Sequence, residues 1–272
     1  MDGFDLDAYL KRIGAAAGPA TLQTLQSLHA AHAGAIPFEG LDPFCGRPVK
    51  LDLASLQAKL VQNRRGGYCF EQNALFKAAL EALGFQVTGL AGRVRWMSPP
   101  DAPLGPREHM LLKVDLPEGA FIADVGFGAC VMDAALRLVA GEEQTTGMGS
   151  FRLDERDGLF YLSAKQTAGW RTMYAFDLEP QRPSDYELGN YFTSTNPAAP
   201  FPNIVIMERV EPGARHKLIN NIYIREARDG ETLEQRPLQS WQDWQAVLEE
   251  TFGVTAPAPA QELFARAKAA AG

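Results

Sequence analysis

The sequence has little of the material from which disulfide frameworks and metal sites are built. It holds three cysteines and four histidines among 272 residues. No two cysteines form a CxxC pair, no HExxH motif occurs, and an odd number of cysteines leaves one unpaired. These features favour free thiols and predict no metal site.

Long apolar runs and an excess of basic residues are also absent. Apolar stretches such as residues 120–125 are far shorter than the ~20 residues of a transmembrane helix. A formal net charge of −7 argues against a general affinity for nucleic acid. Residues 1–13 are acidic and amphipathic, unlike a secretion signal or a transit peptide. The sequence therefore predicts a cytoplasmic protein with no membrane or nucleic-acid partner.

Helical patterns occupy the first part of the chain. Apolar residues repeat with a helical period over residues 5–16 and 22–33. A longer helix starts near Cys69 and ends at Gly84, because glycine commonly follows the last helical residue. We expect residues 1–84 to form a helical domain.

Short segments rich in β-forming residues follow from Phe85 onward. Turn residues such as Pro117-Glu118-Gly119 separate them. A series of short strands joined by turns favours a small barrel or a sandwich. We expect this β domain to cover residues 85–195.

The last part of the chain mixes both patterns. Strands are expected near residues 204–209 and 217–225, and a helix is expected between Ser240 and Gly253. Residues 196–272 are therefore predicted to form an α/β domain, which makes the whole chain an α+β protein.

The most informative segment is residues 65–73, Arg-Gly-Gly-Tyr-Cys-Phe-Glu-Gln-Asn. Gly66 and Gly67 permit backbone conformations that other residues avoid, so the chain can turn sharply into the helix. Cys69 then lies in the first helical turn, where unpaired backbone N–H groups favour a thiolate and can stabilise an oxyanion. Cys69 is a candidate nucleophile, and an inert core cysteine is the alternative.

A cysteine nucleophile needs an imidazole partner, which is itself oriented by an Asp or Asn. His29 and His32 lie among alanines on a helix and are interpreted as surface or packing residues. His216 is flanked by two basic residues, which disfavour its protonation. His109 opens a strongly apolar strand, and it is the candidate partner.

Asp124 ends the next apolar strand, just before Gly126-Phe127-Gly128. A buried carboxylate is costly unless it is paired, and the His109 imidazolium is an obvious partner. The alternative is a carboxylate that accepts backbone N–H bonds from the glycine turn. If Glu118-Gly119 is a two-residue turn, Asp124 pairs with Lys113 and His109 lies about 13 Å away. A triad then requires a bulge, strong strand coiling or another register.

Together these residues resemble the arylamine N-acetyltransferase family. The resemblance covers nearly the whole chain, and the motif around Cys69 is its most specific part. The other matching segments are His109-Met110-Leu111-Leu112, Asp124-Val125-Gly126-Phe127-Gly128, Ile36-Pro37-Phe38-Glu39, and Phe201 after Ser194-Thr195-Asn196-Pro197.

The resemblance implies a helical domain, a β-barrel domain and an α/β lid, with a catalytic core like that of transglutaminases and papain-like enzymes. It implies a triad of Cys69 as nucleophile, His109 as acid/base and Asp124 as orienting group. Acetyl-CoA is then the acyl donor, and an aromatic amine or hydrazine accepts the acetyl group in a ping-pong mechanism without a metal.

Further roles follow from matching positions in the family. Phe38, Phe127 and Phe201 match residues that line the acceptor pocket, with core packing as the alternative. Gly126 and Gly128 match positions that let the acetyl-CoA thioester arm approach the backbone. Arg65 and Glu39 match a structural ion pair that braces the loop beneath Cys69.

Two positions depart from the family pattern. Gly40 stands where the family commonly has an asparagine, so any hydrogen bond from that side chain is missing or replaced. Glu108 stands before His109, where a small hydroxyl residue is common. We expect this carboxylate to alter contacts with the acyl donor or to raise the pKa of His109.

Other functions use the same residues. A transglutaminase-like amide hydrolase and an intramolecular amide synthase both need the triad, and a non-catalytic binding protein needs only the fold. The sequence leaves open the acceptor amine, the acyl chain of the CoA donor and the oligomeric state.

Overall fold

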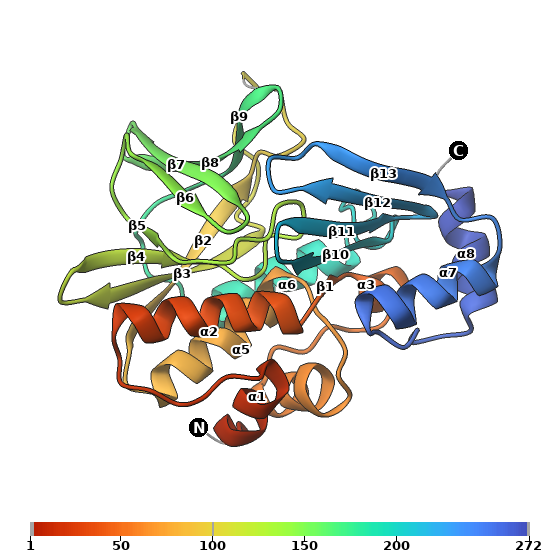
Figure 1. Cartoon of the computed structure of the whole chain (residues 1–272), viewed down its shortest axis with the longest axis horizontal. Coiled ribbons are helices and arrows are strands. Elements are labelled where there is room, and N and C mark those ends of the chain that lie inside the picture. The colour runs from red at the N-terminus through yellow and green to blue at the C-terminus, as the bar shows by residue number, and fades with distance from the viewer. Residues whose placement is uncertain (1–2, 100, 271–272) are drawn as a thin grey trace.

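The computed structural model describes residues 3–99 and 101–270, and its fold is α+β (Figure 1). Helices from the start of the chain lie beneath an eight-stranded sheet in this view. A five-stranded sheet lies beside it, with the C-terminal helices at its far end. In the described part of the chain, no helix is long and apolar enough to cross a membrane.

The predicted helices of the first part are present. Asp5 and Thr21 accept hydrogen bonds from backbone N–H groups in the first turns and cap the first two helices. The first helix is shorter than expected because Gly14 adopts a left-handed conformation with φ of 69° and ends it. The helices are α1 (Leu6–Ile13), α2 (Leu22–Ala35), α3 (Leu41–Phe44), α4 (Leu53–Leu56) with its π-helical continuation η1 (Gln57–Gln62), and α5 (Cys69–Ala82).

The eight-stranded sheet is antiparallel and nearly closed. Its order is β5-β4-β3-β2-β9-β8-β7-β6. Gln144 bridges the two edge strands, since its side chain accepts from the N–H of Arg137 at 2.7 Å and donates to its carbonyl at 2.9 Å. Of the two architectures favoured by the sequence, the barrel is therefore confirmed. The strands are β2 (Gln86–Val94), β3 (His109–Leu116), β4 (Gly119–Ala123), β5 (Leu136–Arg137), β6 (Glu143–Thr146), β7 (Gly149–Arg156), β8 (Leu159–Gln166) and β9 (Gly169–Phe176).

The five-stranded sheet takes one short strand from the N-terminal part. Strand β1 pairs antiparallel with β10, and the order is β1-β10-β11-β12-β13. Ser240 caps the following helix and Gly253 ends it, as predicted. The elements are β1 (Phe38–Glu39), β10 (Ile206–Glu211), β11 (Ala214–Ile219), β12 (Ile222–Ala227), β13 (Thr232–Pro237), α7 (Trp241–Ala246) with its π-helical continuation η2 (Val247–Phe252), and α8 (Ala260–Ala269).

Two parts of the sequence-based description need correction. The single strand expected over residues 217–225 is a hairpin of β11 and β12, because Asn220 adopts a left-handed φ of 53° and turns the chain. Helix α6 (Pro183–Thr195) was not predicted, although Pro183 occupies its first turn as helices favour. The domain boundaries at residues 84 and 195 stay predictions.

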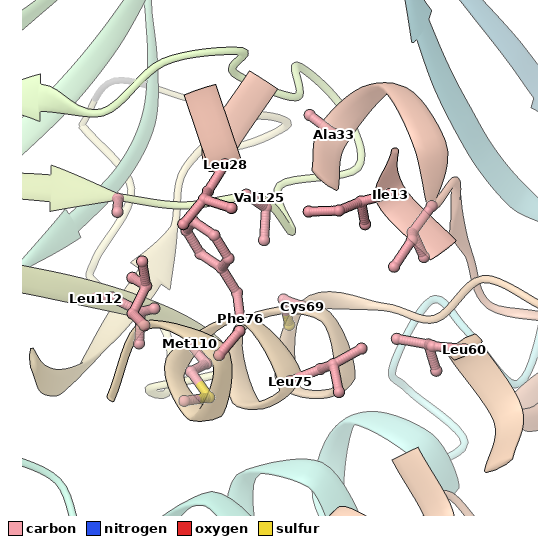
Figure 2. Close-up of a cluster of buried hydrophobic side chains, with 14 of the residues drawn as sticks. Ile13, Leu28, Ala33, Leu60, Cys69, Leu75, Phe76, Met110, Leu112 and Val125 are labelled. Carbon is pink, nitrogen blue, oxygen red and sulfur yellow. The ribbon is translucent and has the colours of Figure 1, made fainter. Parts of the chain in front are cut away.

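A buried apolar cluster joins the helices to the barrel (Figure 2). Leu28 of α2 and Phe76 of α5 point toward Leu112 of β3 and Val125 after β4. Cys69 belongs to this cluster and is the first residue of α5. The start of α5 is therefore held against the strands that carry His109 and Asp124.

Candidate active site

Cys69 is the first residue of α5, and the helix start around it is fixed by a side-chain cap. The carboxylate of Glu71 accepts a hydrogen bond from the backbone N–H of Tyr68 at 3.1 Å. Cys69 is 4% exposed, and its Sγ lies 3.7 Å from the carbonyl oxygen of Glu108. The structure places this thiol at a helix N-terminus, as the motif predicts.

The two glycines before Cys69 are required for space. Neither has a positive φ angle, so the expectation of an unusual backbone conformation there is wrong. A Cβ on Gly66 would lie 2.2 Å from the carbonyl oxygen of Pro37, and one on Gly67 would lie 2.8 Å from Glu71 Oε2. The loop can pack between these groups only because both side chains are missing.

Asp124 is fully buried, and both of its carboxylate oxygens accept hydrogen bonds. Oδ1 accepts from the side chain of Asn73 and the backbone N–H of Gly126, each at 2.9 Å. Oδ2 lies 2.8 Å from the donating hydroxyl of Tyr174 and 2.7 Å from Nε2 of His109. Burial alone would raise the pKa of Asp124, but the His109 charge and these bonds lower it below its usual value. Both roles considered for this carboxylate, imidazolium partner and acceptor of backbone N–H groups, are present.

His109 carries the opposite charge. Burial alone would lower its pKa, but the charge and hydrogen bond of Asp124, aided by a hydrogen bond with Cys69, raise it to about 10. His109 is thus an imidazolium at neutral pH, with Nε2 donating to Asp124. The structure brings the three predicted residues into one connected cluster.

The hairpin register removes the geometric difficulty raised by the sequence. The turn between β3 and β4 comprises Pro117-Glu118, one residue earlier than assumed. The same register sets Asp124 opposite Leu111 rather than opposite Lys113. Leu111 and His109 are two residues apart and face the same side of the strand. The predicted separation of about 13 Å at strand rise is therefore wrong.

A cavity of about 220 Å³ opens beside the Cys69 sulfur, and most of its lining is apolar. Phe38, Phe127 and Phe201 all line it, and their role toward an acceptor stays a prediction. The rings of Phe38 and Phe201 are 5.9 Å apart, and that of Phe127 lies edge-on to His109 at 5.3 Å. The three rings form walls that suit a flat aromatic ligand.

Gly126 and Gly128 line the same cavity at points of close packing. A Cβ on Gly126 would lie 2.8 Å from Cα of Cys69, and one on Gly128 would lie 2.1 Å from a ring carbon of Phe38. Both glycines are therefore needed to seat the nucleophile and the cavity wall. Their role toward an acyl donor stays a prediction.

The structure explains one of the two departures from the family pattern. A Cβ on Gly40 would lie 2.6 Å from Cδ1 of Phe201, so the ring fills the space of a side chain. Glu108 lines the cavity. The expectation that Glu108 alters donor contacts or raises the His109 pKa stays a prediction.

Arg65 and Glu39 form the predicted ion pair within a larger network. Nη2 of Arg65 lies 2.6 Å from Oε1 of Glu39, which is 1% exposed, and 3.3 Å from Asp42. Lys59 links Asp42 to the buried Glu71 at 2.6 and 2.7 Å. Because Glu71 caps the start of α5, the network ties the loop beneath Cys69 to the nucleophile's own helix.

Arg65→Met tests this bracing role. The variant keeps the length of the side chain but leaves the buried Glu39 carboxylate without its cation, so we expect a loss of about 3–5 kcal/mol in unfolding free energy. Arg236→Met, which loses the solvent-exposed pairs with Glu234 and Asp243, serves as the control and should cost less than about 1 kcal/mol. Urea denaturation measures both, and equal losses would show that the network does not brace the loop.

Three residues of the cluster were missed by the sequence analysis. His29 was interpreted as a surface or packing residue, yet it is fully buried and its Nε2 accepts the backbone N–H of Asp124 at 3.2 Å. Burial lowers the pKa of His29 to about 4, so it stays neutral. Asn73 was visible in the motif, one turn after Cys69 on the same helix face. Tyr174 gave no local signal, because only the pairing of β2 with β9 brings it to the site.

His216 and the two other cysteines lie outside the site. His216 is bonded to Tyr223 and Glu211 in the five-stranded sheet. Cys45 and Cys130 are free thiols, and neither lines the cavity. Over residues 3–99 and 101–270, no group of three or more His, Cys, Asp or Glu side chains is placed to hold a metal ion.

Comparisons with known proteins identify the family of the chain. A model of the N-acetyltransferase family matches residues 21–260. The chain is 40% identical over 250 residues to an arylamine N-acetyltransferase of Escherichia coli K12, covering 92% of this chain and 88% of that protein. It is 42% identical over 218 residues to one of Mycolicibacterium smegmatis, covering 79% of each. The solved structure of the Mycobacterium marinum enzyme in complex with CoA matches with a TM-score of 0.93 at 37% identity, covering 98% of this chain and 99% of that one. The chain belongs to the arylamine N-acetyltransferase family.

Proposed function

We propose that this acetyltransferase moves an acetyl group from acetyl-CoA to an aromatic amine or hydrazine through an acetyl-Cys69 intermediate. The observation that carries the proposal is the Cys69–His109–Asp124 cluster at the end of an apolar, ring-lined cavity. Binding of CoA by the M. marinum relative and the names of the curated relatives support the choice of donor and acceptor.

The first half-reaction acetylates the enzyme. The Cys69 thiolate attacks the acetyl carbonyl, and backbone N–H groups in the first turn of α5 stabilise the oxyanion. The bond to the CoA sulfur then breaks, and CoA leaves with a proton from His109. Asp124 keeps the imidazole oriented and stabilises its charge throughout.

The second half-reaction regenerates the thiolate. The acceptor nitrogen attacks the thioester carbonyl, neutral His109 takes the proton from that nitrogen, and the Cys69–carbonyl bond breaks. The products are an acetylated amine and the original thiolate–imidazolium pair. Two acyl transfers with modest barriers replace one difficult transfer.

The cavity residues have separate proposed roles. Phe38, Phe127 and Phe201 hold the acceptor ring, since all three line the cavity. Gly126 and Gly128 line the cavity, and we assign to them the backbone along which the thioester arm of acetyl-CoA passes. We place the reaction in the cytoplasm, without a metal and without a nucleic-acid or membrane partner.

Steady-state kinetics test the two-step transfer. With acetyl-CoA and 4-methylaniline varied together, double-reciprocal plots should give parallel lines, because CoA leaves before the amine reacts. Intersecting lines would point to direct transfer in a ternary complex and contradict the acetyl-enzyme route. A hydrazine acceptor such as phenylhydrazine should give the same pattern.

The same assay separates the alternatives. A cysteine hydrolase would release CoA at one rate with or without amine. An intramolecular amide synthase would act on its own tethered substrate and leave 4-methylaniline unacetylated. A non-catalytic binding protein would release no CoA.

A further inference from the structure

Thr193 of α6 lies beside the apolar cavity, and its buried hydroxyl has no partner among the described residues. The residue is 2% exposed and lines the cavity beside Cys69, and its Oγ1 forms no hydrogen bond among the described residues. Threonine in a helix often bonds back to the carbonyl one turn earlier, and here that bond is not made. A buried hydroxyl without a partner destabilises a protein, so a hydrogen bond to a bound ligand would offset that cost.

Glu108 lines the same cavity. Its backbone carbonyl lies 3.7 Å from the Cys69 sulfur, so its side chain begins beside the nucleophile. In the part of the chain that the structure describes, this carboxylate makes no hydrogen bond or ion pair, and neighbouring Arg107 is paired elsewhere. Burial raises the pKa of Glu108, and the charge of His109 opposes that rise.

Helix α6, which carries Thr193, packs close to the segment that carries Glu108. A Cβ on Gly189, one turn before Thr193, would lie 3.3 Å from the carbonyl oxygen of Arg107, next to Glu108. We propose that Thr193 and Glu108 form a recognition subsite for an amide or hydrazide substituent on the aromatic acceptor. The Thr193 hydroxyl donates to the carbonyl oxygen of the substituent, and the Glu108 carboxylate accepts from its N–H. This inference rests on the proposed function and narrows its acceptor class.

Two acceptors of nearly equal shape but different charge distinguish the effect of acceptor charge from the effect of acceptor size. 4-Aminobenzamide satisfies both groups of the subsite, whereas 4-aminobenzoate offers no donor and sets a second negative charge near Glu108. Because like charges repel strongly where water is largely excluded, kcat/KM for the amide should exceed that for the carboxylate by roughly tenfold or more.

The ratio of these two kcat/KM values is the quantity to measure. In a two-step transfer each value reports only on the reaction of acetyl-enzyme with acceptor, and losses common to both acceptors cancel. Glu108→Gln removes the charge and should reduce the ratio to about threefold or less. Glu187→Gln, an exposed α6 position outside this cavity, is the matched control and should keep the wild-type ratio.

Thr193→Val keeps the shape of the side chain and removes the hydroxyl. We expect kcat/KM for 4-aminobenzamide to fall roughly tenfold, while the melting temperature of the free protein stays the same or rises because an unpaired buried hydroxyl has gone. If Thr193 had only a structural role, Thr193→Val would lower both the kcat/KM value and the melting temperature. Thr193→Ser keeps the hydroxyl and should retain most of the activity toward the amide.

Several results would overturn the subsite. Equal use of the two acceptors by the wild type is one, and an unchanged ratio in Glu108→Gln is another. If Thr193→Val slowed acetylation of Cys69 by acetyl-CoA without affecting the acceptors, the hydroxyl would serve the acyl donor instead. Failure of the wild-type enzyme to become acetylated would refute the proposed function itself, and the subsite with it.

Discussion

Replacing Asp124 by asparagine is expected to lower kcat by about 10⁴-fold. All the groups that face this carboxylate are hydrogen-bond donors, from Asn73, Gly126, Tyr174 and His109. In asparagine one of the two carboxylate oxygens is replaced by an NH₂ group. That group faces two hydrogen-bond donors and cannot accept from them, so two hydrogen bonds are lost. The imidazole then loses both its orientation and its counter-charge, so neither half-reaction has a competent acid/base.

The protonation state of His109 shows whether this loss is electrostatic. In the wild type the pKa of His109 is raised to about 10, so both ring nitrogens carry protons at neutral pH. Without the Asp124 charge, burial lowers that pKa and the ring should be neutral. ¹⁵N NMR of histidine-labelled protein distinguishes the two states. A His109 that remains doubly protonated in Asp124→Asn would contradict this explanation.

A control substitution for this prediction is available on β3, the strand that pairs with β4. Asp115→Asn removes a carboxylate at the far end of β3, where its side chain is 48% exposed and is paired with Lys113. Its activity and unfolding free energy should stay close to those of the wild type. Asp124→Asn should also lose about 3 kcal/mol or more of stability, because buried donors are left unpaired.

The triad residues could be predicted from sequence because each has a local signature. Cys69 follows a glycine pair at a helix start, and His109 and Asp124 stand at the ends of apolar strands. The helix at Cys69 also depends only on neighbouring residues, such as the cap from Glu71. Local chemistry of this kind is visible before any fold is known.

The register between those strands could not be predicted. A shift of one residue in the turn decided whether Asp124 lay opposite Lys113 or Leu111, and turn composition at Pro117-Glu118-Gly119 fits both. The β11–β12 hairpin was missed for a similar reason, since Asn220 turns a run that is continuous in β-forming residues.

The supporting residues depend on contacts that are distant in sequence. Tyr174 reaches Asp124 through the pairing of β2 with β9, and His29 reaches it from α2. The sequence around Tyr174 and around His29 contains no motif that indicates a catalytic role. Thr193 lies on α6, which the strand-rich surroundings concealed, and its missing hydrogen bond is a property of the folded cavity alone.

Cys69→Ala tests the nucleophile on which the whole account depends. Wild-type enzyme mixed with acetyl-CoA and no amine should gain one acetyl group by intact-protein mass spectrometry, and 4-methylaniline should remove it. Cys130→Ala, which removes another buried free thiol, should be acetylated like the wild type. Cys69→Ala should show no adduct, because no other thiol lines the cavity. An acetyl group of equal yield on Cys69→Ala, or none on the wild type, would contradict transfer through this cysteine.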